Sequence, residues 1–69
     1  MDIGTIYKEK KTNSCYICVD ADERTAYLID LCGNSVSGGL NEADYVAATD
    51  DDIIRDAKRN FQYILKEFN

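Results

Sequence analysis

Apolar and polar residues alternate with a period of two along most of the chain and with a helical period at its end. Five short segments have the alternation, or the β-branched and aromatic content, that is typical of strands. These segments are residues 3–10, 15–20, 26–31, 35–37 and 44–48. The polar segments between them suit hairpins and turns, so the sequence predicts four or five antiparallel strands within residues 3–48.

The predicted sheet is expected to be strongly bent. The strands at 15–20 and 26–31 carry apolar residues on both faces, which is typical of strands that are central, curled into a barrel or covered by a helix. The pair Gly38-Gly39 permits a kink or bulge. These glycines are not predicted to bind phosphate, because an acidic stretch follows them and no GxGxxG or GKS/T pattern is present.

Residues 50–68 have the clearest pattern, that of an amphipathic helix. Thr49 and Asp52 have the spacing of a capping box, and the acidic residues 50–52 suit the positive end of the helix dipole. At 100° per residue, the apolar side chains fall within an arc of about 120°. This apolar stripe consists of Ile53, Ile54, Ala57, Phe61, Ile64, Leu65 and Phe68. We expect it to close the open side or end of the sheet, which gives a single α+β domain over residues 1–69.

The opposite face of this helix is polar and carries one large ring. It consists of Arg55, Asp56, Arg59, Gln62, Tyr63, Lys66 and Glu67. The Tyr63 ring, with Arg59 one turn before it and Glu67 one turn after it, suits two roles. It packs on the stems of its neighbours, or it is an exposed contact for a partner. The pattern leaves both roles open.

Composition narrows the classes of function. A chain of 69 residues buries a small core, so its stability is marginal and a homodimer is expected. The sequence has no histidine, so it offers no imidazole base near neutral pH and no Ser-His or Cys-His pair. We therefore expect a protein that is not an enzyme and holds no cofactor.

The sequence also indicates a cellular compartment. No apolar run approaches the roughly 18 residues of a membrane span, and the first residues lack the pattern of a signal peptide. Three cysteines, an odd number, suit reduced thiols better than a disulfide framework. A cytoplasmic protein without membrane contact is the expectation.

Two groups of residues have the composition of metal sites. Cys15 and Cys18 have CxxC spacing, but residues three apart on a strand lie about 10 Å apart and point to opposite faces. Both are therefore predicted to be buried structural cysteines. Carboxylates pair at Asp20 with Asp22 and in the 42–44 segment, without the spacing of a calcium loop. Solvated loops and helix capping are favoured for them.

The distribution of charge says more than these motifs. Residues 20–56 carry ten acidic and two basic side chains, a net charge of −8, whereas the whole chain carries −5. If the hairpin tip at 21–25, the turn at 41–44 and the helix start share one end of the fold, they form a negative patch. Such a patch opposes direct nucleic-acid binding and suits a basic protein partner, including the phosphate groove of a nucleic-acid-binding protein.

The residues expected to bind this partner are Asp20, Asp22, Glu23, Glu42, Asp44, Arg59 and Tyr63. Simple solubility is the other explanation for the charge. A different class of function, a small-ligand or nucleotide-binding module, would place its site between sheet and helix or at a dimer interface.

The chain also resembles a known group of proteins. The run Ile3-Gly-Thr-Ile-Tyr-Lys-Glu-Lys10, then Tyr16-Ile-Cys-Val-Asp20, a second apolar strand and Asp44-Tyr-Val46 are similar to small SH3-like barrels. The resemblance covers roughly residues 3–48 and is strongest to the small barrels encoded by phages and mobile elements. It implies a binding module without catalytic residues, such as an inhibitor of a host or defence protein in a bacterial cytoplasm. The acidic middle departs from the basic surface of RNA-binding SH3-like barrels.

Overall fold

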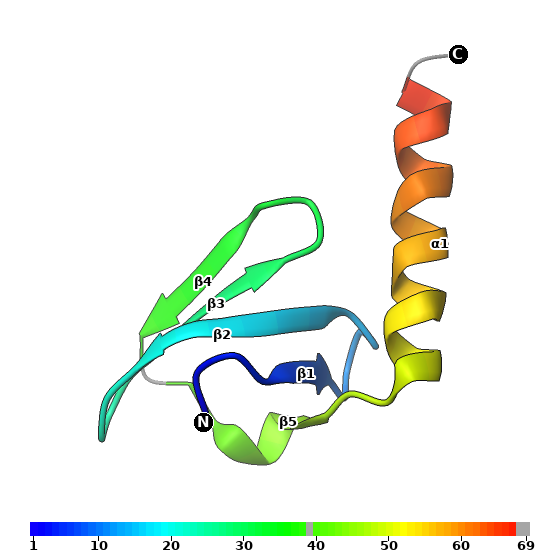
Figure 1. The fold of residues 1–69 in the computed structure, drawn as a ribbon. Helices are drawn as coiled ribbons and strands as arrows, with labels where there is room; N and C mark the ends of the chain where they lie inside the picture. Colours follow the sequence, from blue (N-terminus) through cyan, green and yellow to red (C-terminus); the bar gives the residue numbers. More distant parts are fainter. Residues whose placement is uncertain (39, 68–69) are drawn as a thin grey trace.

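The computed structural model describes residues 1–38 and 40–67, which form a five-stranded antiparallel sheet and one long helix (Figure 1). The elements are β1 (Ile6–Glu9), β2 (Cys15–Ala21), β3 (Ala26–Asp30), β4 (Ser35–Gly38), the short 3₁₀ helix η1 (Glu42–Asp44), β5 (Tyr45–Ala47) and α1 (Asp50–Glu67). The predicted strands and the α+β class are confirmed. The first strand begins later than predicted because residues 2–5 form a turn, closed by the N–H of Thr5 donating to the carbonyl of Asp2.

The strands lie in the order β4-β3-β2-β1-β5. In the described residues β4 and β5 are the two edges and do not pair with each other, so closure into an SH3-like barrel is not confirmed. The sheet is nevertheless irregular. Its β2–β3 register shifts between Cys18 and Asp20, and Gly38 ends β4 with φ +114°, a conformation that favours glycine. Gly39, the second glycine of the predicted bend, lies outside the described residues.

The two faces of the sheet differ in how well they are covered. On one face Cys18 pairs with Leu28 across β2 and β3, and both are fully buried. On the other face Ile6, Ile17 and Ile29 stand in register across β1, β2 and β3. We call these three side chains the isoleucine ladder. Ile17 in the middle of the ladder is still 38% exposed, so this face has little cover.

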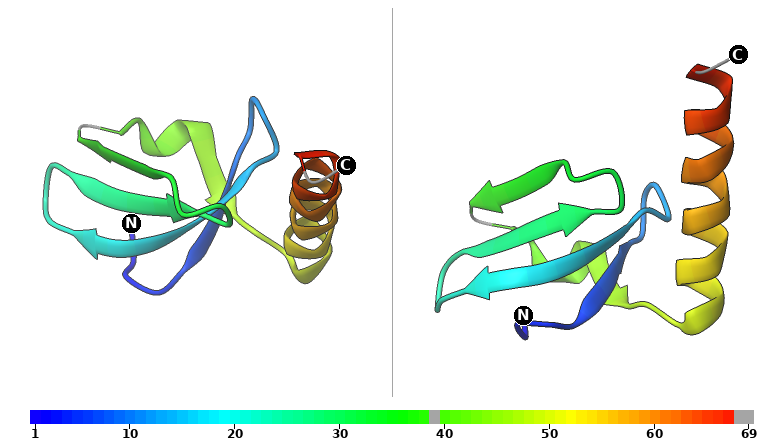
Figure 2. Two further views of the ribbon diagram at one scale, coloured as in Figure 1. Left: turned by 90° about the horizontal axis from the view of Figure 1, so that it is seen from above. Right: turned by 45° about the horizontal axis from the view of Figure 1, so that its top comes forward.

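The helix stands at the end of the sheet where β2 begins and rises past it (Figures 1 and 2). The molecule is elongated, with extents of 43 × 21 × 20 Å. Its radius of gyration is 12.5 Å, whereas a compact chain of this length has about 11 Å. Residues 61–67 of α1 are all exposed.

The expectation that the apolar stripe closes the sheet was wrong for most of its residues. Ile54 is 52% exposed, Phe61 71% and Leu65 62%, while Ile53 reaches the isoleucine ladder. Phe68, the last predicted stripe residue, lies outside the described residues. The reason is that a different face of the helix meets the sheet.

Candidate interaction surface and the helix junction

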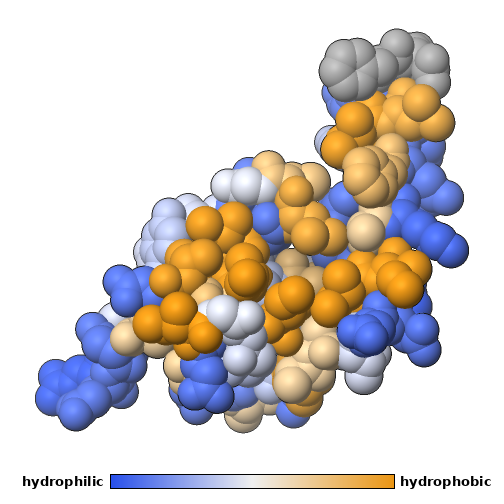
Figure 3. All heavy atoms as spheres, viewed as in Figure 1, coloured by the Kyte–Doolittle hydropathy of each residue, from blue (hydrophilic) through white to orange (hydrophobic). Residues whose placement is uncertain are grey.

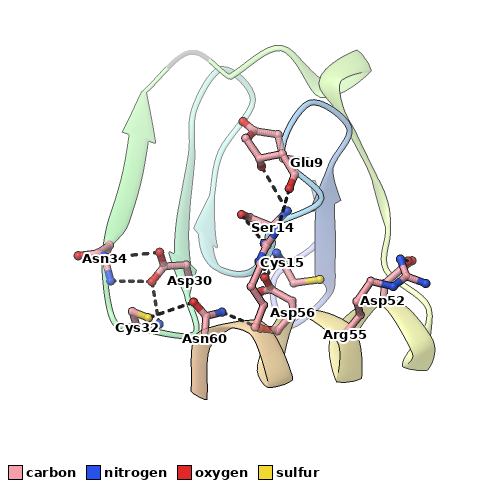
Figure 4. A network of polar contacts seen from close by, with 12 residues as sticks. Glu9, Ser14, Cys15, Asp30, Cys32, Asn34, Asp52, Arg55, Asp56 and Asn60 are labelled. Atoms are coloured by element: carbon pink, nitrogen blue, oxygen red, sulfur yellow. Dashed lines mark hydrogen bonds and ion pairs between the residues drawn. The ribbon is translucent and has the colours of Figure 1, made fainter. Parts of the chain in front are cut away.

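A polar face of α1 contacts the sheet (Figure 4). Asp56, predicted on the solvent side, is 2% exposed. Its carboxylate accepts hydrogen bonds from the backbone N–H of Cys15, at 3.0 Å, and from the guanidinium of Arg59. Helical periodicity identifies residues that share a face but does not say which face meets the sheet. The Cys15 N–H at the start of β2 needs a partner when buried, and Asp56 supplies it.

Asp52 lies one turn earlier and caps the helix. Its carboxylate accepts from the Thr49 N–H at 3.0 Å, and its own N–H donates to Thr49 Oγ1 at 3.1 Å, which confirms the predicted capping box. Lys8 Nζ of β1 lies 3.1 Å from the other carboxylate oxygen. The Thr49 hydrogen bond, followed by that of Lys8, lowers the pKa of Asp52 from 3.8 to about 2.

Arg59 and Tyr63, two of the predicted partner-binding residues, have different surroundings. The guanidinium of Arg59 donates to the carbonyl of Thr12 at 3.2 Å and to Ser14 Oγ at 3.1 Å, besides Asp56. It therefore ties the helix to the turn between β1 and β2. Tyr63, one turn further along, is 63% exposed, as predicted.

The acidic residues near the β2–β3 hairpin tip gather at the other end of the molecule. Asp20 and Asp22 line a depression of about 310 Å³, and Asp22, Glu23 and Glu42 line a second of about 230 Å³. We call these four residues the acidic end. The hairpin tip is a strongly hydrophilic projection in Figure 3. Asp44, predicted to belong to the same site, lines neither depression.

Local hydrogen bonds fix the backbone of this tip. One oxygen of Asp22 accepts from the N–H groups of Arg24, at 2.8 Å, and Thr25, at 2.7 Å, which builds the turn. These bonds, that from Arg24 first, lower the pKa of Asp22, so its carboxylate is charged at neutral pH. Glu42 pairs with the Met1 ammonium group at 2.8 Å, which offsets part of the negative charge.

The helix start does not join the acidic end, so the single patch predicted from residues 20–56 does not form. Cys15 at the start of β2 contacts the helix, whereas the hairpin tip follows the end of β2. The seven residues of β2 span about 20 Å between them. Three acids outside the acidic end, Asp30, Asp52 and Asp56, accept hydrogen bonds that fix other parts of the fold. The carboxylate of Asp30 accepts the N–H groups of Cys32 and Asn34. The acidic residues that are concentrated between residues 20 and 56 of the sequence therefore lie in different parts of the fold, and some of them serve as internal hydrogen-bond acceptors.

The cysteines occupy the expected positions on the strand. Cys15 and Cys18 are free and buried, at 2% and 0% exposure, which confirms the prediction of structural cysteines. Burial, and next the carboxylate of Asp56, raises the pKa of the Cys15 thiol. Cys32 is exposed. Over residues 1–38 and 40–67, no three Cys, Asp or Glu side chains are arranged to hold a metal ion.

Sequence reasoning did not find the helix junction. The signal was the spacing of Asp52, Asp56 and Asn60, which places one polar side chain per turn on a single face. Asn60 lies beside the turn after β3, where its side-chain oxygen is 3.4 Å from Cys32 Sγ.

Comparisons with protein-family models, with curated proteins and with solved structures each gave no match. Within the part of the chain that the structure describes, no helix has both the length and the apolar character of a membrane span.

Proposed function

We propose that this protein is a small, non-enzymatic interaction module that docks its acidic end on a basic surface of another protein. The observation that carries the proposal is the meeting of Asp20, Asp22, Glu23 and Glu42 around two adjoining depressions at the hairpin tip. Carboxylates arranged in this way attract Lys and Arg side chains and speed the encounter of the two proteins. Surfaces that bind nucleic-acid phosphates are rich in Lys and Arg. We therefore expect the partner to be a nucleic-acid-binding protein.

This proposal agrees with the function expected from the resemblance to small phage-encoded barrels. A module that occupies a phosphate-binding groove competes with nucleic acid, and this is how it would inhibit a host or defence protein. The absence of histidine from the sequence supports binding over hydrolytic catalysis. Of the seven predicted contact residues, the acidic end supplies four, and Tyr63 and Arg59 lie apart from it on α1.

The alternative, a small-ligand module with its site between sheet and helix, has less support. Two depressions along this junction measure about 130 Å³ and 60 Å³. Typical ligand sites have about 300–1,000 Å³. The polar face of the helix fills the junction with Asp52, Asp56 and Asn60, all of which contact other parts of the chain.

A charge-reversal experiment tests the proposal. Asp20→Lys combined with Glu23→Lys reverses two charges of the acidic end and spares the turn-forming oxygen of Asp22. The immobilised wild type is expected to retain basic nucleic-acid-binding proteins from a bacterial lysate. Duplex DNA should then displace them. The reversed variant should lose at least about tenfold in affinity for a purified captured protein, which corresponds to the 1.4 kcal/mol expected for lost close charge pairs.

The matched control is Asp51→Lys combined with Glu67→Lys, which makes the same change in net charge on α1, away from the acidic end. It should bind like the wild type. Equal binding by the reversed variant, equal loss in both double variants, or captured proteins that DNA does not displace would each contradict the proposal. Circular dichroism of both variants confirms that the fold is unchanged.

A further inference from the structure

The protein exposes more surface than its mass requires. Its accessible surface is 5,122 Å². A compact monomer of 7.8 kDa has about 4,400 Å², so the excess is roughly 700 Å². A stable protein–protein interface buries about 800 Å² on each partner. The excess therefore has the size of one half of an interface.

Much of this excess lies on the apolar stripe of α1 and the neighbouring turn. Leu31, Ile54, Phe61, Ile64 and Leu65 are 42–71% exposed. At about 200 Å² for a fully exposed large side chain, they present roughly 550 Å². An apolar patch of this size is near the upper end of what monomeric proteins expose, and such patches often serve as interaction sites.

The stripe is continuous with the apolar face of the sheet. Ile53 at its base lies with Ile6, Ile17 and Ile29 around one small space, and Leu31 bridges that space to the groove along the helix. Figure 3 shows the hydrophobic surface passing from the middle of the sheet onto the helix. The result is an L-shaped apolar surface with one arm on the sheet and one on α1.

We propose that a second copy of this chain covers this surface, with the two α1 helices packed antiparallel. Residues 50–56 of the helix carry four acidic side chains and one basic, whereas residues 57–67 carry three basic and one acidic. An antiparallel pair sets the acidic start of each helix beside the basic half of the other, whereas a parallel pair sets like charges together.

The shape of the groove fits the same arrangement. Leu31, Ala57 and Ile64 line a groove of about 130 Å³ beside Phe61. In the dimer the groove of each copy receives the Phe61 ring of the other copy. Both of these exposed rings are then buried. The two acidic ends stay at the far ends of the dimer, so this inference does not rest on the function proposed above.

Sedimentation equilibrium over a micromolar concentration series tests the dimer. The wild type should have twice the mass of the 7.8 kDa chain at the upper concentrations. Phe61→Asp combined with Leu65→Asp should weaken the dimer by about 100-fold or more, because both side chains lie at the centre of the proposed interface. The amides of residues 61–67 should exchange hydrogen more slowly in the wild-type dimer than in this variant.

The matched control is Tyr63→Asp combined with Gln62→Asp, which adds the same two negative charges at exposed positions of the same helix outside the stripe. It should remain a dimer. A monomeric wild type, a stripe variant that still dimerises, or a control variant that dissociates equally would overturn the inference. A monomer that floats with phosphatidylglycerol vesicles would show that a lipid surface covers the stripe instead.

Discussion

Residues 50–60 of α1 pack against the sheet through polar side chains, whereas residues 61–67 are all exposed although Phe61, Ile64 and Leu65 are among them. Both halves belong to one helix with one apolar stripe. The first half is held because its polar face carries acceptors that the sheet and turns need. The second half rises past the start of β2 and away from the sheet (Figure 1), and within the described residues it makes no comparable contact with the strands.

This difference shows that an amphipathic helix does not always bury its apolar side. Burial of apolar area stabilises a fold by about 25 cal/mol per Å². An unpaired buried N–H costs about 1–3 kcal/mol, which is comparable to leaving one apolar side chain in water. At the start of β2, the Cys15 N–H is satisfied by Asp56, and this contact sets the rotation of the helix. With this rotation the base of the apolar stripe reaches the open face of the sheet, and the rest of the stripe points to solvent.

Loss of the buried carboxylate of Asp56, which holds the first half of α1 on the sheet, should have the largest effect on stability. Asp56→Ala leaves the Cys15 N–H buried without a partner and frees Arg59. We expect a loss of about 3 kcal/mol in the free energy of unfolding, measured by urea denaturation. Asp56→Asn keeps an oxygen acceptor and should lose about 1 kcal/mol. The exposed Asp51→Ala in the same helix should lose less than about 1 kcal/mol.

Equal losses for Asp51→Ala and Asp56→Ala would mean that helix charge, and not the buried hydrogen bond, determines the effect. A loss below about 1 kcal/mol for Asp56→Ala would contradict the polar docking of α1 altogether.

Much of the sheet was predictable because local pattern determines it. Cys15 to Ala21 and Ala26 to Asp30 are strands for the reason that the sequence indicates, their β-branched and aromatic content. The capping box was predictable for the same reason, since Thr49 and Asp52 are three residues apart and each side chain bonds to the other's backbone. Closure of the sheet was not predictable, because it depends on whether two distant edge strands meet.

Only those residues of the candidate site that lie close together in the sequence could be predicted. Asp20, Asp22 and Glu23 lie close in sequence, so a hairpin is enough to gather them. The helix start has the same charge, but a strand of seven residues separates it from the tip. Which acids stay on the surface depends on tertiary hydrogen bonds, such as that between Asp56 and Cys15. The spacing of Asp52, Asp56 and Asn60 marks a shared polar face but does not identify what that face contacts.

Asp52, at the anchored start of α1, should make the stability of the protein depend on pH. Because the pKa of Asp52 is lowered from 3.8 to about 2, its contribution to stability is complete above the ordinary pKa. It is lost as the pH falls from 3.8 through 2. Asp52→Asn should therefore flatten the pH dependence of unfolding in this window relative to the wild type. Thr49→Ala should cost about 1 kcal/mol at neutral pH.

Thermal unfolding at several pH values from 2 to 6 measures both effects. The comparison of wild type with Asp52→Asn removes the contribution of other carboxylates, including Asp22. If the two curves run parallel through the window, the capping box and Lys8 do not hold the Asp52 carboxylate in its charged form.

The smallest expected effect is that of Tyr63, which stands one turn after Arg59 at the boundary between the two halves of α1. Arg59→Ala removes bonds to Thr12, Ser14 and Asp56 and should cost about 1–2 kcal/mol of unfolding free energy. Tyr63→Ala removes an exposed ring and should change that free energy by less than about 0.5 kcal/mol. Urea denaturation of the two variants at one protein concentration measures the difference. A Tyr63 effect as large as that of Arg59 would place the boundary at least one turn further along the helix, because the Tyr63 ring would then also belong to the anchored half.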